Sequence, residues 1–191
     1  MLGVLGVLGV FGAGLSAQAP AAPVAPAANE YGRVPKFEVQ AFSMPGGRIK
    51  FEYPKKDWQL VPGGSTALVS AVQKQGQAGV VVEESKLVQA LAPEDITDLF
   101  GQIESDVVKE RQPGATDIQS KVIDAGGRRL VIVTYGRPGI AGPERVRQYS
   151  ITSGTSLYRI TCSAAAATFP RFEPTFAHLA ASFAAAESGT H

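Results

Sequence analysis

The chain is predicted to fold as an α+β domain in which helices cover an antiparallel β-sheet. Two observations on its 191 residues support this prediction. Short β-rich runs dominate residues 48–163, whereas residues 93–110 and 169–184 carry apolar side chains at helical spacing. The resulting order is strands, a helix, four strands and a second helix, which is typical of an antiparallel sheet with helices packed on it.

The first group of predicted strands lies before residue 84. Arg48–Tyr53 alternates, with Ile49 and Phe51 on the same face, and it ends at Pro54. The residues 62–66 form a glycine-rich turn that lacks the lysine of a phosphate-binding loop. The remaining strands of this group are expected at Trp58–Val61, Ala67–Val72 and Gly79–Glu83.

The first helix is predicted over Pro93–Glu110. A proline and several acids stand at its start, where they suit the backbone and the dipole of a helix N-terminus, and Pro113-Gly114 ends it. The apolar stripe expected to face the sheet consists of Ile96, Leu99, Phe100, Ile103 and Val107.

Strands return after this helix. Ala125-Gly126-Gly127 and Gly154-Thr155 are predicted turns, the second a compact hairpin turn. Arg129–Tyr135 and Gly79–Val82 are apolar on both faces, so we expect central strands with a helix against at least one face. The strands of this group are expected at Asp117–Asp124, Arg128–Tyr135, Arg145–Ser153 and Ser156–Ser163.

The last predicted helix falls within Phe169–Ala184 and is expected to begin near Arg171. Pro174 would then lie in its first turn, where a proline is tolerated. The stripe expected to dock on the sheet consists of Phe172, Phe176, Leu179, Ala180 and Phe183.

Residues 1–19 are predicted to be a secretory signal peptide, because the run is apolar, uncharged and ends in small residues. Cleavage is expected between Ser16 and Ala21, so the mature chain would be periplasmic or extracellular and have no transmembrane span. A retained membrane anchor is the alternative, although the run is shorter than the roughly 20 residues of a spanning helix. The first positive charge is Arg33, so the usual charged leader is missing, and a start upstream of Met1 is one explanation.

The rest of the chain divides into three parts. Residues 20–33 are a Pro/Ala-rich linker, which favours extended conformations and cannot build a core. Residues 34–186 are expected to form one globular domain, and residues 187–191 a flexible tail.

Composition excludes several classes of function. The formal net charge of +1 argues against nucleic-acid binding. One cysteine, Cys162, rules out an internal disulfide, and with only two histidines it rules out the usual Cys/His zinc sites. Cys162 shares a face with Tyr158 and Ile160 and is expected to be a small buried residue rather than a reactive thiolate.

No catalytic, cofactor-binding or metal-binding residue is predicted. His178 lies two positions beyond Phe176 and is expected to be a solvated surface residue rather than a base, and His191 is terminal. The neighbours Glu83-Glu84 should point apart on a strand, and Glu94-Asp95 suit a helix N-terminus.

The charges are unevenly distributed along the chain. Acids predominate in residues 83–110, and arginines in residues 111–171. Arginine suits carboxylate or phosphate partners and is enriched at interfaces. The alternative is that these arginines pair with the acidic helix or are solvated at strand edges. The candidate partner surface consists of Arg128, Arg129, Arg145 and Arg147.

Several segments together resemble the PsbP-like superfamily, whose fold is shared by photosystem extrinsic proteins, Ran-binding Mog proteins and several bacterial envelope proteins. The resemblance covers nearly all of residues 48–184. It implies an α/β/α sandwich and, since members mostly act as binding or assembly modules, no active site to carry over. It rests on Ile49–Pro54 with the following Trp58, Gly79–Glu83, Ile96–Val108, the Gly126-Gly127-Arg128 turn into Leu130–Tyr135, and Phe169-Pro170 to Ser182-Phe183.

The expected function is that of a non-catalytic, exported binding or accessory domain, whose partner is another envelope or secreted protein. One alternative is an extrinsic subunit associated with photosystem II, which the resemblance permits. The other is an envelope hydrolase, which would need a deep pocket lined by converging polar groups.

Overall fold

The computed structural model describes residues 36–63, 67–125 and 128–186. The predicted signal peptide, the linker, the C-terminal tail, His191 and the turn residues 64–66 and 126–127 lie outside this part. The α-helices are α1 (Asp98–Arg111) and α2 (Phe169–Ser182). The strands are β1 (Val39–Ser43), β2 (Ile49–Pro54), β3 (Trp58–Pro62), β4 (Ala67–Gln73), β5 (Ala78–Lys86), β6 (Thr116–Ala125), β7 (Arg128–Gly139), β8 (Gly142–Ser153), β9 (Ser156–Ala165) and β10 (Ala184–Ala185).

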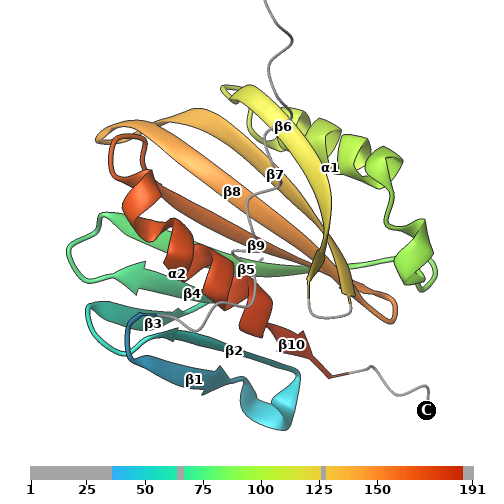
Figure 1. Ribbon diagram of the computed structural model, residues 1–191, viewed down its shortest axis with the longest axis horizontal. Coiled ribbons are helices and arrows are strands. Elements are labelled where there is room, and N and C mark those ends of the chain that lie inside the picture. Colours follow the sequence, from blue (N-terminus) through green and yellow to red (C-terminus); the bar gives the residue numbers. More distant parts are fainter. Residues whose placement is uncertain (1–35, 64–66, 126–127, 187–191) are drawn as a thin grey trace, which may run out of the picture.

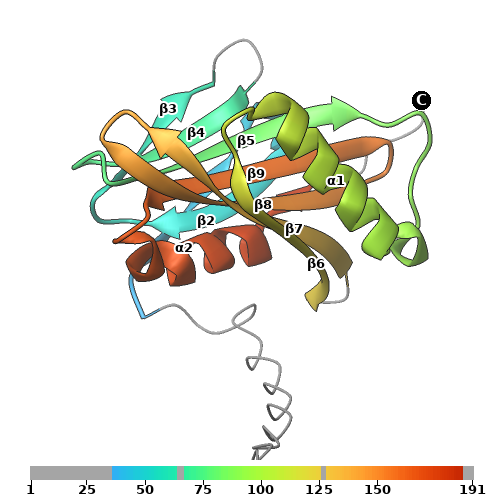
Figure 2. The same ribbon diagram turned by 90° about the horizontal axis from the view of Figure 1, so that it is seen from above.

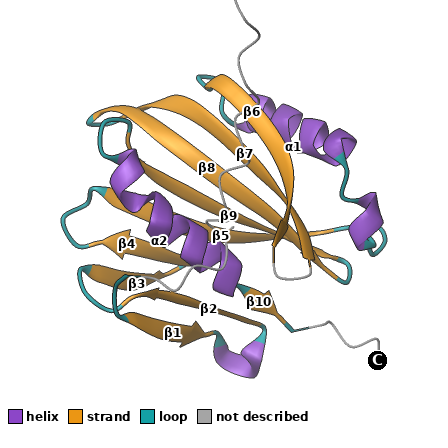
Figure 3. Ribbon diagram, viewed as in Figure 1, coloured by secondary structure: helices purple, strands orange, loops and turns teal. Residues whose placement is uncertain are grey.

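Seven of these strands form one large antiparallel sheet in the order β3-β4-β5-β9-β8-β7-β6 (Figures 1 and 3). Its tight β8–β9 hairpin turns at Gly154-Thr155, as predicted, and Gly154 has a φ of 55°, which glycine adopts without strain. The predicted central strands are confirmed, since β5 lies between β4 and β9 and β7 between β6 and β8. The α+β fold class is therefore confirmed.

A second, smaller sheet contains β1, β2 and β10. The expectation of one continuous sheet is wrong, because β2 pairs with β1 and β10 and not with β3. The alternation along β2 is correct, and Ile49, Phe51 and Tyr53 are buried. β1 lacks strict alternation and β10 has two residues, so neither gives a strand signal in the sequence.

Helix α2 lies between the two sheets (Figure 1). It contacts β2 on one side and β5, β8 and β9 on the other, and the predicted phenylalanine stripe fills this space. The helix begins at Phe169, not near Arg171, because Pro170 suits the first turn. Pro174 is consequently inside the helix, where it removes one intrahelical hydrogen bond.

Helix α1 lies on the opposite side of the large sheet, over β6 and β7 (Figure 2). It begins at Asp98, later than predicted, since Pro93–Asp95 form a separate 3-10 turn. Gly101 lets the helix approach the sheet closely, because a Cβ there would lie 3.3 Å from the hydroxyl oxygen of Ser120. A second core, smaller than the one under α2, packs beneath the helix.

Candidate functional site

The inner face of α1 buries a carboxylate. Glu104 is 1% exposed, and the side chain of Arg159 on β9, which faces it, is 8% exposed. Arg159 donates two hydrogen bonds to Glu104, from Nε to Oε2 at 2.8 Å and from Nη2 to Oε1 at 2.7 Å. This bidentate geometry is the strongest form of carboxylate–guanidinium pairing. The pair ties the middle of α1 to a central strand.

Neighbouring side chains complete the hydrogen bonding of this pair. Ser150 donates to Glu104 Oε2 at 2.5 Å, and Gln148 donates to the same oxygen at 3.2 Å. Arg159 also donates from Nη1 to the hydroxyl of Ser85 at 2.9 Å. A buried ion pair is tolerated only when its remaining donors and acceptors are satisfied in this way. The arrangement leaves the carboxylate occupied by internal donors, which suits an anchor and not a general base.

The pair decides which side of α1 faces outward. Gly101, Glu104 and Val108 are the buried residues of the helix. The prediction that Leu99 and Ile103 face the sheet is wrong, because their exposed fractions are 65% and 50%. Of the rest of that stripe, Ile96 is buried before the helix begins, and Phe100 and Val107 are half-buried.

The outward side of α1 carries a defined stripe of four residues. At about 100° per residue, they lie directly opposite the buried face. Two are apolar and occupy the first half of the helix, and two are acidic, exposed and occupy the second half. We name this surface the α1 outer stripe: Leu99, Ile103, Asp106 and Glu110.

A second buried carboxylate, Glu84 on β5, lies on the α2 side of the sheet. It forms ion pairs with Arg48 and with Lys86, whose Nζ is 2.9 Å from Oε1. Ser156 donates to the same oxygen at 2.7 Å. Glu83 points to the opposite face and is half-buried, so the expected divergence of these neighbours is confirmed. The cluster joins the large sheet to Arg48, the residue before β2.

Two of the four candidate interface arginines hold α2. Arg128 donates to the carbonyl oxygens of Ala180, Ala181 and Phe183 at 3.1, 2.8 and 2.5 Å, and so caps the C-terminal end of the helix. Arg147 pairs with Glu173 of α2 at 2.6 Å, and its guanidinium lies 5.6 Å from the ring centroid of Phe169.

The other two arginines lie at opposite ends of the sheet. Arg129 pairs with Asp124 at 3.1 Å beside the β6–β7 turn, whereas Arg145 lies opposite Gly136, seven residues further along β7. At about 3.3 Å per residue, this separates them by roughly 23 Å along the strand. They also point to opposite faces, so the structure does not place the four arginines in one patch.

His178 is not the solvated residue that the sequence predicted. Its Nε2 lies 2.8 Å from Oε2 of Glu52 on β2, and its ring meets Phe37 edge-on at 6.1 Å. Ser182, one turn further along α2, accepts a hydrogen bond from the Glu52 amide at 3.0 Å and donates to the Leu179 carbonyl at 3.1 Å.

Glu52, His178 and Ser182 are the residue types of a catalytic triad, but their hydrogen bonds do not have the geometry of one. Among the described residues, the hydroxyl of Ser182 is hydrogen-bonded to the backbone of Glu52 and Leu179 and not to His178. A nucleophile needs a hydrogen bond to its base. We therefore read Glu52, His178 and Ser182 as the contacts that join β2 to α2.

Cys162 behaves as the sequence predicted. It is fully buried in the core under α2, together with Tyr158 and Ile160. Burial raises the pKa of its thiol far above the ordinary value, although Arg147 opposes this shift. The thiol is therefore protonated at neutral pH.

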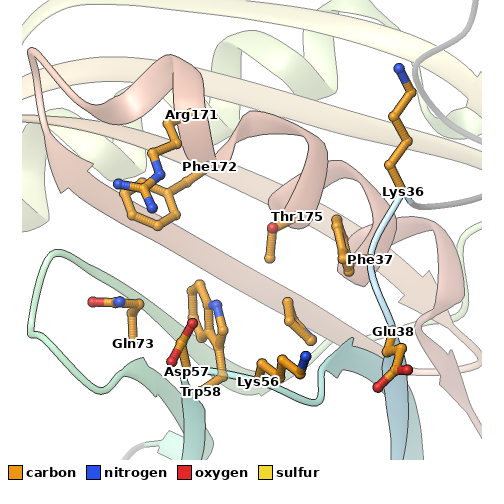
Figure 4. Close-up of a pocket in the computed structure, with 11 residues that line it drawn as sticks. Lys36, Phe37, Glu38, Lys56, Asp57, Trp58, Gln73, Arg171, Phe172 and Thr175 are labelled. Carbon is orange, nitrogen blue, oxygen red and sulfur yellow. The ribbon is translucent and has the colours of Figure 1, made fainter.

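A hollow of about 470 Å³ opens between the residues before β1, the β2–β3 turn and the start of α2. Figure 4 shows Trp58 and Phe172 lining its inner part, with the guanidinium of Arg171 beside the ring of Phe172 and Asp57 near the indole. Among the described residues, those that line it include no histidine, cysteine or serine. It does not unite the nucleophile, base and orienting group that a hydrolase requires.

The described residues contain no cluster of three or more His, Cys, Asp or Glu side chains able to hold a metal ion. Neither helix of residues 36–186 is long and apolar enough to span a membrane.

Sequence reasoning missed the main buried polar residues of this fold. Glu104 and Arg159 are ordinary members of a charged helix and an alternating strand, and their pairing joins positions 55 residues apart. A signal was present in the strand pattern, because Gln148 and Ser150 interrupt the apolar alternation of β8 on the face toward α1. Polar residues inside a predicted core face indicate a buried partner.

No protein-family model matches the chain, and no curated sequence matches it at a significant level. Solved structures do. Cyanobacterial PsbP (CyanoP) from Synechocystis sp. PCC 6803 superimposes with a TM-score of 0.59 and 17% identity, over 81% of this chain and 96% of that chain. LpqN of Mycobacterium tuberculosis, involved in cell envelope biogenesis, superimposes with a TM-score of 0.56 and 15% identity, over 76% of this chain and 90% of that chain.

The Saccharomyces cerevisiae Ran-binding protein Mog1p gives a TM-score of 0.53 and 12% identity, over 78% of this chain and 96% of that chain. Identities this low establish the fold and not the activity. The three structures nevertheless share the arrangement that the sequence segments suggested. This chain has the PsbP/Mog-like fold.

Proposed function

We propose that this chain is an exported, non-catalytic domain that binds another envelope or secreted protein. The observation that carries the proposal is the exposure of Leu99 and Ile103 on the face of α1 turned away from the sheet. Single exposed apolar residues are common on soluble proteins, but two on adjacent turns, opposite the buried face, give an apolar strip that suits contact with a partner.

The polar clusters support a binding role over a catalytic one. Glu104 and Glu84 accept hydrogen bonds from internal donors, and His178 is engaged by Glu52. An enzyme of the hydrolase class needs such groups poised toward a substrate. Here they connect secondary-structure elements to each other.

The structural neighbours point the same way. Mog1p is a Ran-binding protein, and LpqN is involved in cell envelope biogenesis. The likeness to cyanobacterial PsbP concerns the fold, and no residue described above favours a photosystem role. The apolar run at residues 1–19 supports export. Of the predicted arginine surface, Arg145 stays a candidate for partner contact, since its side chain forms no hydrogen bond or ion pair with other described residues.

Crosslinking in the native host tests the proposal. The tagged full chain is crosslinked in intact cells, purified and analysed by mass spectrometry, with a tagged unrelated exported protein as the control. The proposal predicts a recurrent protein partner that the control does not capture, and a mature N-terminus between Ser16 and Ala21 on sequencing. Recovery of the chain alone, or of an N-terminus that retains the apolar run, would overturn the corresponding part.

A further inference from the structure

We infer that the α1 outer stripe is the binding surface, and that its occupant is a basic amphipathic helix of a partner protein. The inference deepens the proposed function and rests on it. It follows from the stripe formed by Leu99 and Ile103 in the first half of the helix and by Asp106 and Glu110 in the second. The partner helix would set apolar residues against the first half and lysine or arginine against the second.

The orientation of α1 is held by its buried side. Turning the helix to bury Leu99 and Ile103 would carry Glu104 into solvent and strand Arg159 in the core without its carboxylate. An uncompensated buried charge is strongly destabilising. The close contact of Gly101 with Ser120 also fits the present orientation alone. The apolar pair therefore stays exposed in the folded chain, available to a partner.

The spacing of the stripe suits another helix. Leu99 and Ile103 are four residues apart, which places them one above the other on the same ridge of α1. Ridges of this kind pack into the groove of a facing helix. The stripe runs from Leu99 to Glu110, about 16 Å at 1.5 Å per residue, which matches roughly three turns of a partner helix.

The charge around the stripe selects a basic partner. Five exposed acids lie in or just before α1, and the exposed bases there are Lys109, which pairs with Asp106 at 2.8 Å, and Arg111. Glu104 is neutralised from within by Arg159, so the excess of negative charge faces outward. A partner with lysine or arginine beside its apolar residues is complementary to this surface. The exposed acids are Glu94, Asp95, Asp98, Asp106 and Glu110.

The same charges disfavour two other occupants. An anionic membrane surface would be repelled by the acids. A second copy of the chain packed in parallel on α1 would oppose acids with acids, and an antiparallel copy would set Asp106 and Glu110 against Leu99 and Ile103. Neither arrangement pairs the acidic half of the stripe.

The test measures binding of defined probes to the purified full chain. The first probe is a synthetic helical peptide with a leucine stripe whose second half is flanked by lysines, and the second has glutamates in place of the lysines. Titrations are followed by calorimetry and by NMR shifts. We expect the lysine peptide to bind with shifts centred on Leu99 and Ile103, and the glutamate peptide to bind at least about tenfold more weakly.

Substitutions locate the contact. Two double variants are compared: Leu99→Ala with Ile103→Ala, and Asp106→Lys with Glu110→Lys. Each should weaken the binding of the lysine peptide by about tenfold or more. Each should leave the thermal unfolding temperature unchanged, because these side chains are exposed. The matched control is Ile140→Ala on the β7–β8 hairpin, a fully exposed apolar residue outside the α1 outer stripe, which should alter neither quantity. The inference is overturned if both peptides bind equally well, or if the control variant loses as much binding of the lysine peptide as the two double variants.

A photo-crosslinking residue placed at position 103 in cells gives the partner itself, with position 140 as the control. A crosslinked partner peptide that is helical, apolar and rich in lysine or arginine supports the inference. Crosslinks to lipid, to a second copy of the chain, or to a partner captured equally from position 140 contradict it. A partner captured only elsewhere on the chain leaves the proposed function standing and removes the α1 outer stripe as its site. The absence of any partner removes both.

Discussion

Arg159 on β9 holds Glu104 on α1 through two hydrogen bonds, of 2.8 and 2.7 Å, in a place that solvent hardly reaches. The relationship fixes both the position and the rotation of α1. It explains why the helix buries a carboxylate and exposes Leu99 and Ile103. The proposed binding surface is thus a consequence of a buried ion pair on the opposite side of the same helix.

The ion pair predicts a sharp asymmetry between single and double substitutions. Glu104→Ala leaves the guanidinium of Arg159 buried without its partner, so we expect a loss of about 3–5 kcal/mol in the free energy of unfolding. Glu104→Leu combined with Arg159→Met removes both charges and should be less destabilising than Glu104→Ala alone. Urea denaturation of the two variants measures this. A loss below about 1 kcal/mol for Glu104→Ala would contradict the anchoring role.

Arg128 is predicted to stabilise the end of α2. Arg128→Ala leaves carbonyl groups of Ala180, Ala181 and Phe183 without this donor, and we expect a loss of about 1–3 kcal/mol, measured by denaturation. Arg128→Lys should recover only part of it, because one ammonium cannot reproduce the fork of a guanidinium. Full recovery by lysine would show that charge alone, and not the capping geometry, matters.

Charge reversal at Arg147 and at Arg145 is expected to have different effects on stability. Arg147→Glu sets a carboxylate against Glu173 and removes the contact with Phe169, so thermal unfolding should occur at a clearly lower temperature. Arg145→Glu is matched in chemistry and lies two residues away on the same face of β8, and we expect a change within about 0.5 kcal/mol. Equal destabilisation by both substitutions would refute the assigned difference.

Cys162 predicts a specific loss of stability in alkali. Burial raises the pKa of the thiol in the folded chain. The thiol therefore contributes its full stabilisation to the folded state below the unfolded pKa of about 8.5. This stabilisation declines as the pH rises from there toward the folded pKa. The expected decline is about 1.4 kcal/mol per pH unit above 8.5 for this group. Unfolding free energies of the wild type and Cys162→Ala should therefore converge between pH 8.5 and 10. Curves that stay parallel would mean that the thiol ionises in the folded chain.

Local pattern was enough to predict much of this fold. Alternation predicted β2 and its buried face, and Gly154-Thr155 predicted the β8–β9 turn. The phenylalanine stripe predicted which face of α2 is buried in the core. These features depend on residues close together in the sequence. The resemblance of ordered segments to PsbP-like proteins then predicted the fold that the superpositions show.

The features that the sequence did not predict depend on distant residues. An apolar stripe on α1 suggested that Leu99 and Ile103 are buried, but the pairing of Glu104 with Arg159 outweighed it. The surroundings of His178 likewise depend on Glu52 in a second sheet, whose other two strands, β1 and β10, carry no clear sequence signal. Helical periodicity identifies which residues share a face, whereas the opposite element decides which face turns inward.

The rotation of α1 can be measured by thiol labelling. Ile103→Cys and Val108→Cys are made separately and treated with a maleimide under native conditions, with the buried Cys162 retained as an internal reference. We expect labelling at position 103 at nearly the rate of a free peptide, and protection at position 108 comparable to that of Cys162. Protection at position 103 together with rapid labelling at position 108 would contradict this rotation of α1.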